Sequence, residues 1–131
     1  MKKRIAICML AVMIVLALAA CGGGGTTETA TSEKDAYGAS RELTLTFDAD
    51  GNITEVKWRE LINGKDKDSS YASELSEADY EAAQDALTKS MKYGETLAET
   101  KDIDKVEAVS GATDSYDDMV KLYNEIMEKV K

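Results

Sequence analysis

The chain has 131 residues, of which 16 are Lys or Arg and 25 are Asp or Glu, so it carries a net charge of −9 at neutral pH. An acidic surface repels phosphate backbones, and no basic cluster offers the footprint of a nucleic-acid-binding protein, so no nucleic-acid partner is expected. The chain also contains no histidine, which excludes a Ser-His-Asp hydrolase and a His-ligated metal site. Redox or group-transfer chemistry would therefore come from a cofactor, from carboxylates or from hydroxyls.

The N-terminal segment has the pattern of a lipoprotein export signal. Basic residues at positions 2–4 precede an apolar run over 5–20, which ends in Leu-Ala-Ala before Cys21. The run is shorter than the about 20 apolar residues that a membrane-spanning helix needs, and small residues stand before the cleavage point. We therefore predict a signal peptide over 1–20 rather than a retained anchor helix. A lipidated Cys21 would then hold the protein by membrane lipid on the extracytoplasmic face of the cell membrane.

The segment after the signal, 21–36, is rich in Gly, Thr, Ser and Glu and has few apolar residues. Because it cannot bury enough surface to offset the entropy of ordering, it is predicted to be a flexible tether. The remainder, 37–131, is long enough for one modest core. We expect an α+β domain there, with a small antiparallel sheet, a hairpin or meander, packed against two main helices.

The first predicted element of this domain is a β-hairpin. Residues 43–47 alternate apolar and polar side chains, and 48–52 supply turn residues. The second strand follows over 53–58, with Val56 and Trp58 on one face. We expect the apolar face of the hairpin to pack against the last helix.

Two helices are predicted after the hairpin. Ser76 begins a capping box, and the helix that follows is expected to run to about Lys92 and to be broken by Gly94. Residues 103–109 are expected to be extended, and 116–130 to form an amphipathic closing helix. The apolar stripes are Tyr80, Ala83, Leu87 and Met91 in the first helix and Met119, Val120, Tyr123, Ile126, Met127 and Val130 in the second.

A short motif lies between these helices. It consists of Ser110, Gly111, Ala112 and Thr113, and Ser115 follows it. The motif resembles the Ser-Gly-Ala-Thr sequence on which proteins of the FMN-binding domain family carry covalent FMN. The order of strands, helices and motif resembles the same family, most closely its small lipoproteins of extracellular electron transfer. In that family a flavin transferase reads Asp-x-x-Ser/Thr-Gly-Ala-Thr-x-Ser/Thr, and Glu107 stands where the family has Asp.

The resemblance implies an extracytoplasmic electron carrier or subunit, rather than a stand-alone enzyme, with FMN esterified to Thr113. The other site residues it implies are Ser110, Gly111, Ala112, Ser115 and Glu107. The implied partners are a flavin transferase and a membrane quinone-linked redox protein. The residues suit this chemistry, because small neighbours leave the Thr113 hydroxyl accessible and the start of a helix favours a phosphate.

Other interpretations stay open. Ser115 can be an ordinary helix N-cap with Asp118 as its capping partner, in which case the motif is a plain loop. The chain can also be a surface lipoprotein that binds a ligand or partner without flavin, or, third in order, a flavin-dependent reductase. Of the aromatic side chains, Phe47 and Tyr123 are expected in the core, whereas Trp58 and Tyr116 suit either packing or a flavin wall.

Overall fold

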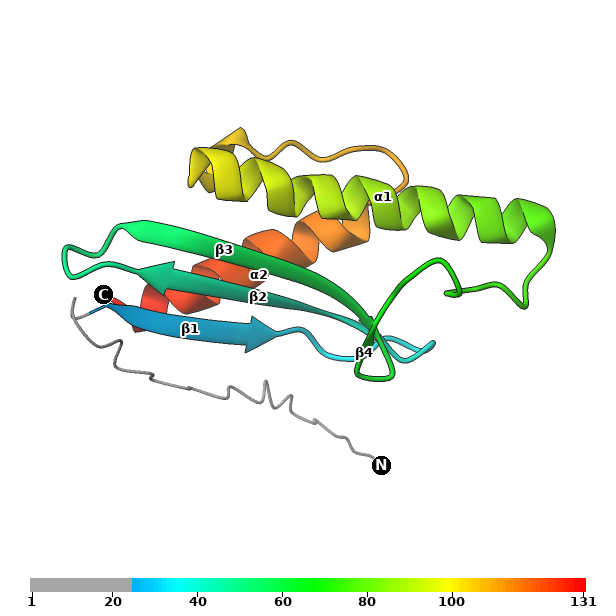
Figure 1. The fold of residues 1–131 in the computed structure, drawn as a ribbon, viewed down its shortest axis with the longest axis horizontal. Coiled ribbons are helices and arrows are strands. Elements are labelled where there is room, and N and C mark those ends of the chain that lie inside the picture. Colours follow the sequence, from blue (N-terminus) through cyan, green and yellow to red (C-terminus); the bar gives the residue numbers. More distant parts are fainter. Residues whose placement is uncertain (1–24) are drawn as a thin grey trace, which may run out of the picture.

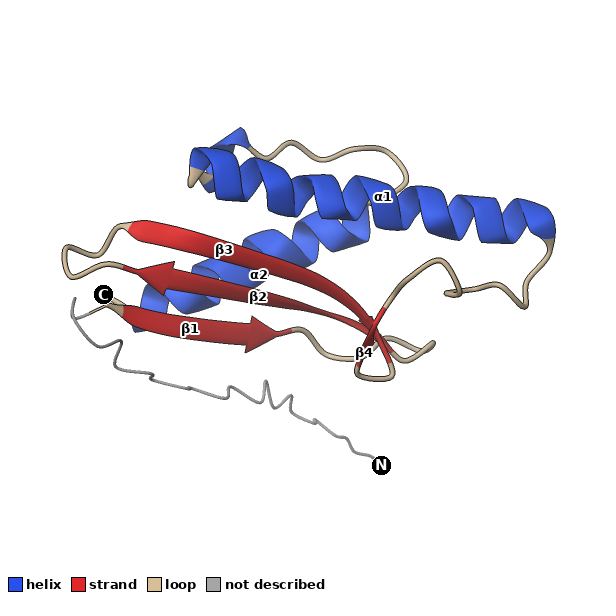
Figure 2. Cartoon of the chain, in the orientation of Figure 1, coloured by secondary structure: helices blue, strands red, loops and turns tan. Residues whose placement is uncertain are grey.

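The computed structural model describes residues 25–131, so the predicted signal peptide and Cys21 lie outside the described residues. The described part contains an antiparallel meander in the order β1-β2-β3-β4, followed by the helices (Figure 1). The strands are β1 (Thr26–Thr31), β2 (Ala39–Phe47), β3 (Ile53–Ile62) and β4 (Lys65–Asp66), and the helices are α1 (Glu77–Thr100), a 3-10 turn η1 (Ile103–Lys105) and α2 (Thr113–Lys129) (Figure 2). The predicted α+β fold with two main helices is confirmed.

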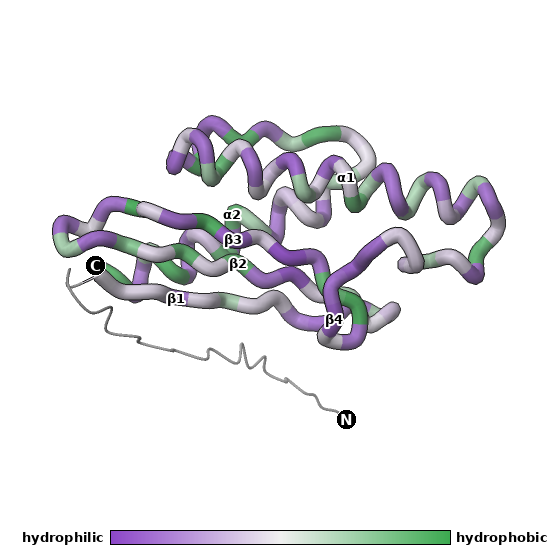
Figure 3. Tube along the Cα trace, viewed as in Figure 1, coloured by the Kyte–Doolittle hydropathy of each residue, from purple (hydrophilic) through white to green (hydrophobic). Residues whose placement is uncertain are grey.

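The two helices cover one face of the sheet. α2 lies against β1 and β2, while α1 lies against β3. Hydrophobic and hydrophilic residues alternate along β2 and β3 (Figure 3), and cross-strand neighbours such as Leu43 and Trp58 share the buried face. The predicted hairpin is confirmed. Its first strand, β2, packs against the last helix as expected, but its second strand, β3, packs against α1 instead. The core side chains are Ala30, Leu43, Leu45, Phe47, Ile53, Trp58, Tyr93, Leu97, Val106, Ala112, Met119, Leu122 and Ile126.

The prediction of a flexible tether over 21–36 is wrong for residues 26–31. Thr26–Thr31 forms strand β1, which pairs with β2 along its whole length. Threonine favours strands because its branched side chain fits a pleated surface, and hydroxyl pairs such as Thr29 with Thr44, at 2.8 Å, link the outer faces of the two strands. Ala30 supplies the contact with the core. The low apolar content hid this strand because its partner β2 provides most of the hydrophobic surface.

The prediction that Gly94 breaks the first helix is also wrong. The Ser76 side chain caps α1 as predicted, by accepting from the Asp79 amide, but the helix continues to Thr100. A Cβ atom on Gly94 would lie 2.7 Å from Cβ of Trp58, so glycine permits close packing of α1 on β3. The buried face of α1 is correspondingly Ser90, Tyr93 and Leu97, and Met91 of the predicted stripe is exposed.

The closing helix begins three residues earlier than predicted, at Thr113. Its predicted apolar face is correct in its main members, Met119 and Ile126, but Leu122 is also fully buried and was not expected there. The expected extended approach over 103–109 contains the 3-10 turn η1. Neither α1 nor α2 combines the length and apolar composition that a membrane span requires.

Candidate functional site

The motif Ser110-Gly111-Ala112 forms a tight turn directly before α2. The amide of Ala112 donates to the carbonyl of Val109 at 3.0 Å, and Gly111 has a φ of +96°. A positive φ at the third position is typical of a type II turn and favours glycine there. Ala112 is buried in the core, so a small side chain is required beside the turn. We call residues 109–112 the motif turn.

The motif turn is fastened to α1 at both of its ends. The Tyr93 hydroxyl accepts a hydrogen bond from the Val109 amide at 2.8 Å and donates to the Ala112 carbonyl at 3.1 Å. Between these anchors, Lys89 donates to the Ser110 carbonyl at 3.0 Å. The turn is therefore held through its backbone, which leaves the Ser110 side chain exposed.

Thr113 is the first residue of α2, and its side chain is exposed. The N-cap residue, Ala112, offers no side-chain acceptor to the amides of the first turn, and Tyr116 is the first residue whose amide bonds back into the helix. The amides of residues 113–115 are therefore available to an anion beside the Thr113 hydroxyl, at the positive end of the helix dipole. This arrangement suits an anion such as a phosphate group.

Ser115 is buried and does not cap the helix. Its hydroxyl donates to Oε2 of Glu60 at 2.5 Å. The same carboxylate accepts from Ser90 of α1 at 2.5 Å and forms ion pairs with Arg41 of β2 and with Lys67, both at 3.0 Å. We call these five residues the polar cluster. The alternative in which Ser115 is an N-cap and Asp118 its partner is thus wrong, because Asp118 instead forms an ion pair with Arg41 at 2.8 Å.

Glu60 is ionised despite its burial. Burial opposes the charged carboxylate, but hydrogen bonds from Ser115 and Ser90 and the charges of Arg41 and Lys67 outweigh this effect and hold the pKa of Glu60 below its ordinary value. Four donors from four segments therefore share one carboxylate. A buried charge that is this fully paired fixes the positions of the groups around it.

The remaining predicted residues divide into surface and core. Glu107 is exposed. Trp58, for which packing and a flavin wall were both open, is 5% exposed and donates its indole N–H to Ser90 at 2.9 Å, so it belongs to the core. Tyr116 is half-buried and packs edge-on against Tyr93, with ring centroids 5.8 Å apart, within one helical turn of Thr113. Phe47 lies in the core and Tyr123 packs against it, as expected.

Sequence reasoning missed the central residue of the site, Glu60, and its partner Arg41. The signal was present in the period-two pattern of the strands. Counting on from Val56 and Trp58 places Glu60 on the buried face, and counting back from Leu43 places Arg41 there. The two residues stand directly opposite each other in the pairing of β2 with β3. Opposite charges on the buried face of neighbouring strands predict a buried ion pair.

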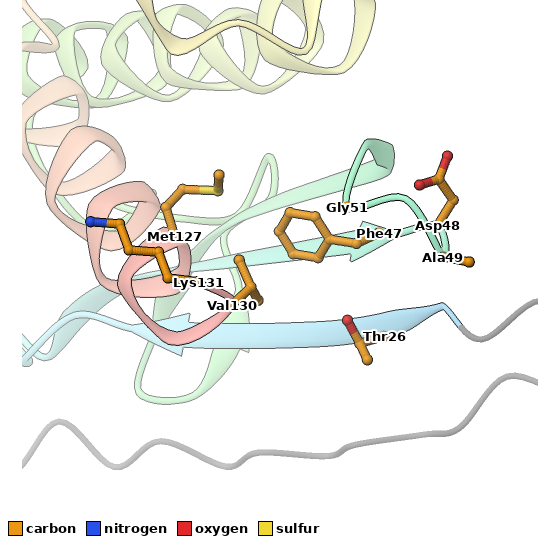
Figure 4. A pocket seen from close by; sticks show the side chains of 8 residues that line it. All are labelled: Thr26, Phe47, Asp48, Ala49, Gly51, Met127, Val130 and Lys131. Carbon is orange, nitrogen blue, oxygen red and sulfur yellow. The ribbon is translucent and has the colours of Figure 1, made fainter.

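Two surface grooves flank α2. One lies at its C-terminal end, where Phe47, Met127 and Val130 line a half-open hollow of about 380 Å³ (Figure 4). Met127 stands 14 residues after Thr113, or about 21 Å along the helix axis, so this groove is remote from the motif. The other, of about 420 Å³, lies beside the first turns of α2 and is lined by charged side chains, among them Arg41 and Asp114.

The FMN-binding domain family matches residues 37–128 of the chain. The match spans most of the described fold, including the motif turn and α2, and leaves out β1. No curated protein and no solved structure matches the chain. The chain belongs to the FMN-binding domain family, and FMN is its cofactor.

Proposed function

We propose that this domain carries FMN covalently, through a phosphoester on Thr113, and acts as an extracytoplasmic electron carrier. The observation that carries the proposal is the exposed hydroxyl of Thr113 at an uncapped helix N-terminus. The hydroxyl is accessible to a second protein, and the free amides of residues 113–115 can stabilise the phosphate once it is attached. Asp114 and Asp117 oppose an anion here, whereas the charge of Asp118 is balanced by Arg41.

The attachment requires an activated flavin nucleotide and a flavin transferase. A bond forms between Thr113 Oγ and the flavin phosphorus, the bond from that phosphorus to its leaving group breaks, and the hydroxyl proton passes to a base of the transferase. The chain supplies the acceptor atom and its orientation. The described chain offers no histidine or cysteine near Thr113 that could serve as this base.

Electron transfer follows from the cofactor rather than from the side chains. FMN supplies one- and two-electron redox chemistry, and the protein supplies position and electrostatic environment. The acidic first turn of α2 would make the flavin surroundings negative, while Arg41 balances the charge of Asp118 and Lys89 lies beside the motif turn. A membrane quinone-linked protein is the redox partner that we propose, because the lipoprotein signal would keep the domain at the membrane.

The proposed anchor would hold the domain close to the bilayer. Thr26, the first residue of β1, stands five residues after Cys21, and five extended residues span at most about 18 Å. Substitution Cys21→Ser should abolish incorporation of a radiolabelled fatty acid and release the protein from washed membranes. Equal labelling of the Cys21→Ser variant and the wild type would contradict lipidation at this residue.

The covalent bond is tested by removing a single oxygen atom. Thr113→Val is nearly isosteric but cannot form the ester, so it should abolish flavin attachment while leaving thermal unfolding of the apo domain unchanged. The measurement is incubation with a purified flavin transferase and flavin adenine dinucleotide, followed by denaturing electrophoresis under ultraviolet light and intact-mass analysis. Thr54→Val is the matched control, because Thr54 is an exposed threonine of β3.

The outcomes separate covalent from non-covalent binding. A fluorescent wild-type band and a fluorescent Thr54→Val band, together with a dark Thr113→Val band, would support the ester at Thr113. A wild-type domain that binds FMN in solution but loses it on denaturation would defeat the covalent proposal. Attachment to Thr113→Val would place the ester on another hydroxyl.

A further inference from the structure

The last serine of the motif sequence faces the interior. Ser115 is 5% exposed, and its hydroxyl donates to Oε2 of Glu60. A flavin transferase that meets the folded domain can contact Ser110, Gly111 and Thr113, which are exposed, but not the Ser115 hydroxyl. Any effect of the Ser115 hydroxyl on attachment would therefore have a cause inside the domain.

Glu60 provides that cause because it fixes α2 to the rest of the fold. Ser115 lies two residues after Thr113, within the same helical turn, so a bond at Ser115 sets the rotation of α2 about its own axis and with it the direction of the Thr113 side chain. The Glu60 carboxylate is itself fixed, because Arg41 and Lys67 each form an ion pair with it at 3.0 Å. It therefore does not move with Ser115.

The motif turn is held independently from the other side. Tyr93 and Lys89 of α1 bind the backbone on either side of Gly111. Thr113 thus lies between two fixed points. The motif turn before it is held by the Tyr93 hydroxyl, and Ser115 after it is held by the Glu60 carboxylate. Both fixed points are buried, and the residue between them is exposed.

We propose that Glu60 is a positioning residue for flavin attachment, which acts through Ser115 to present the Thr113 hydroxyl to the transferase. The inference rests on the proposed covalent attachment at Thr113. It requires that the transferase acts on the folded domain and that Ser115 serves by its bond to Glu60. If instead the transferase reads Ser115 directly, the motif must leave the fold before it is modified.

The chain contains a matched control for this inference. Ser90 and Ser115 both donate to Oε2 of Glu60 at 2.5 Å, but Ser90 belongs to α1 and its hydroxyl forms no hydrogen bond with the motif. Ser115→Ala and Ser90→Ala each remove one hydrogen bond to the same oxygen, and Ser90→Ala also leaves the Trp58 indole without its acceptor. A loss of attachment caused only by lower stability would therefore be at least as large in Ser90→Ala.

The experiment compares initial rates of attachment with purified transferase and flavin adenine dinucleotide at a temperature at which every variant is folded. We expect Ser115→Ala to lower kcat about tenfold or more, since a small misplacement of a reacting atom has effects of this order, with little change in the KM for the domain. Ser90→Ala should stay within about twofold of the wild type. Ser115→Thr keeps the hydroxyl and should restore most of the rate.

Amide hydrogen exchange of the apo domains gives a second readout, independent of the transferase. Exchange over residues 116–119 should accelerate in Ser115→Ala relative to the rest of α2, and not in Ser90→Ala. Equal losses of rate in the two variants, a wild-type rate in Ser115→Ala, or unchanged exchange at the start of α2 would each overturn the inference. Failure of the proposed function appears differently, as a wild-type domain that accepts no flavin.

Discussion

The two ends of α2 are attached to the sheet by different interactions. Its central and C-terminal turns place Met119, Leu122 and Ile126 in the hydrophobic core over β1 and β2. Its first turn rests on the polar cluster, in which Ser115 contacts Glu60. Apolar burial is strong but non-directional, whereas charged hydrogen bonds require particular distances and angles. The apolar end holds the helix on the sheet, and the polar end determines how its first residue is oriented.

The same contrast explains which features the sequence made predictable. The hairpin, the Ser76 cap and the main face of α2 follow from short-range periodicity and capping chemistry, and all three are present. Strand β1 depends on a partner that supplies its hydrophobic surface, so its own composition does not reveal it. The turn at Gly111 and the exposed Thr113 agree with the motif, because a turn is a local structure.

The polar cluster was missed because its members come from segments far apart in the sequence. Period-two alternation places Arg41 and Glu60 on the buried face, but only the packing of both helices brings Ser90 and Ser115 to the same carboxylate. A glycine in a helical pattern is similarly ambiguous. Gly94 can end a helix or allow a close approach, and the position of Trp58 decides between the two.

The largest effect is expected at the polar end. Glu60→Gln keeps the shape of the side chain but leaves Arg41 and Lys67 without their buried counter-charge, which should destabilise the domain by about 3–5 kcal/mol. Urea unfolding followed by circular dichroism measures this loss. If our inference is correct, the folded fraction of this variant should also accept flavin more slowly than the wild type.

Leu122→Ala is the comparison from the apolar end. It removes a fully buried side chain and should lower the free energy of unfolding by about 2–5 kcal/mol, while its folded fraction should accept flavin at the wild-type rate.

The pH dependence of stability separates Glu60→Gln from Leu122→Ala further. Because the folded pKa of Glu60 lies below the unfolded one, its contribution is present above about pH 4.5 and is lost as the pH falls through the folded value. The difference in free energy of unfolding between the wild type and Glu60→Gln should therefore become smaller below about pH 4.5. The difference between the wild type and Leu122→Ala should stay the same.

A smaller effect is expected where α1 packs on β3, at the point where Trp58 contacts Gly94 and donates to Ser90. Gly94→Ala gains about 1 kcal/mol of helix propensity, but its Cβ would stand 2.7 Å from Cβ of Trp58. Overpacking of this kind costs about 1–3 kcal/mol, so we expect a net loss of about 1 kcal/mol in urea unfolding. A gain in stability would show that α1 can move away from β3 without cost and that close packing at Gly94 is not required. Because Ser90 lies one turn from Gly94, any displacement of α1 in this variant should also weaken the hydrogen bond from Ser90 to Glu60 and leave the apolar end of α2 unchanged. Amide exchange along the two helices measures this difference.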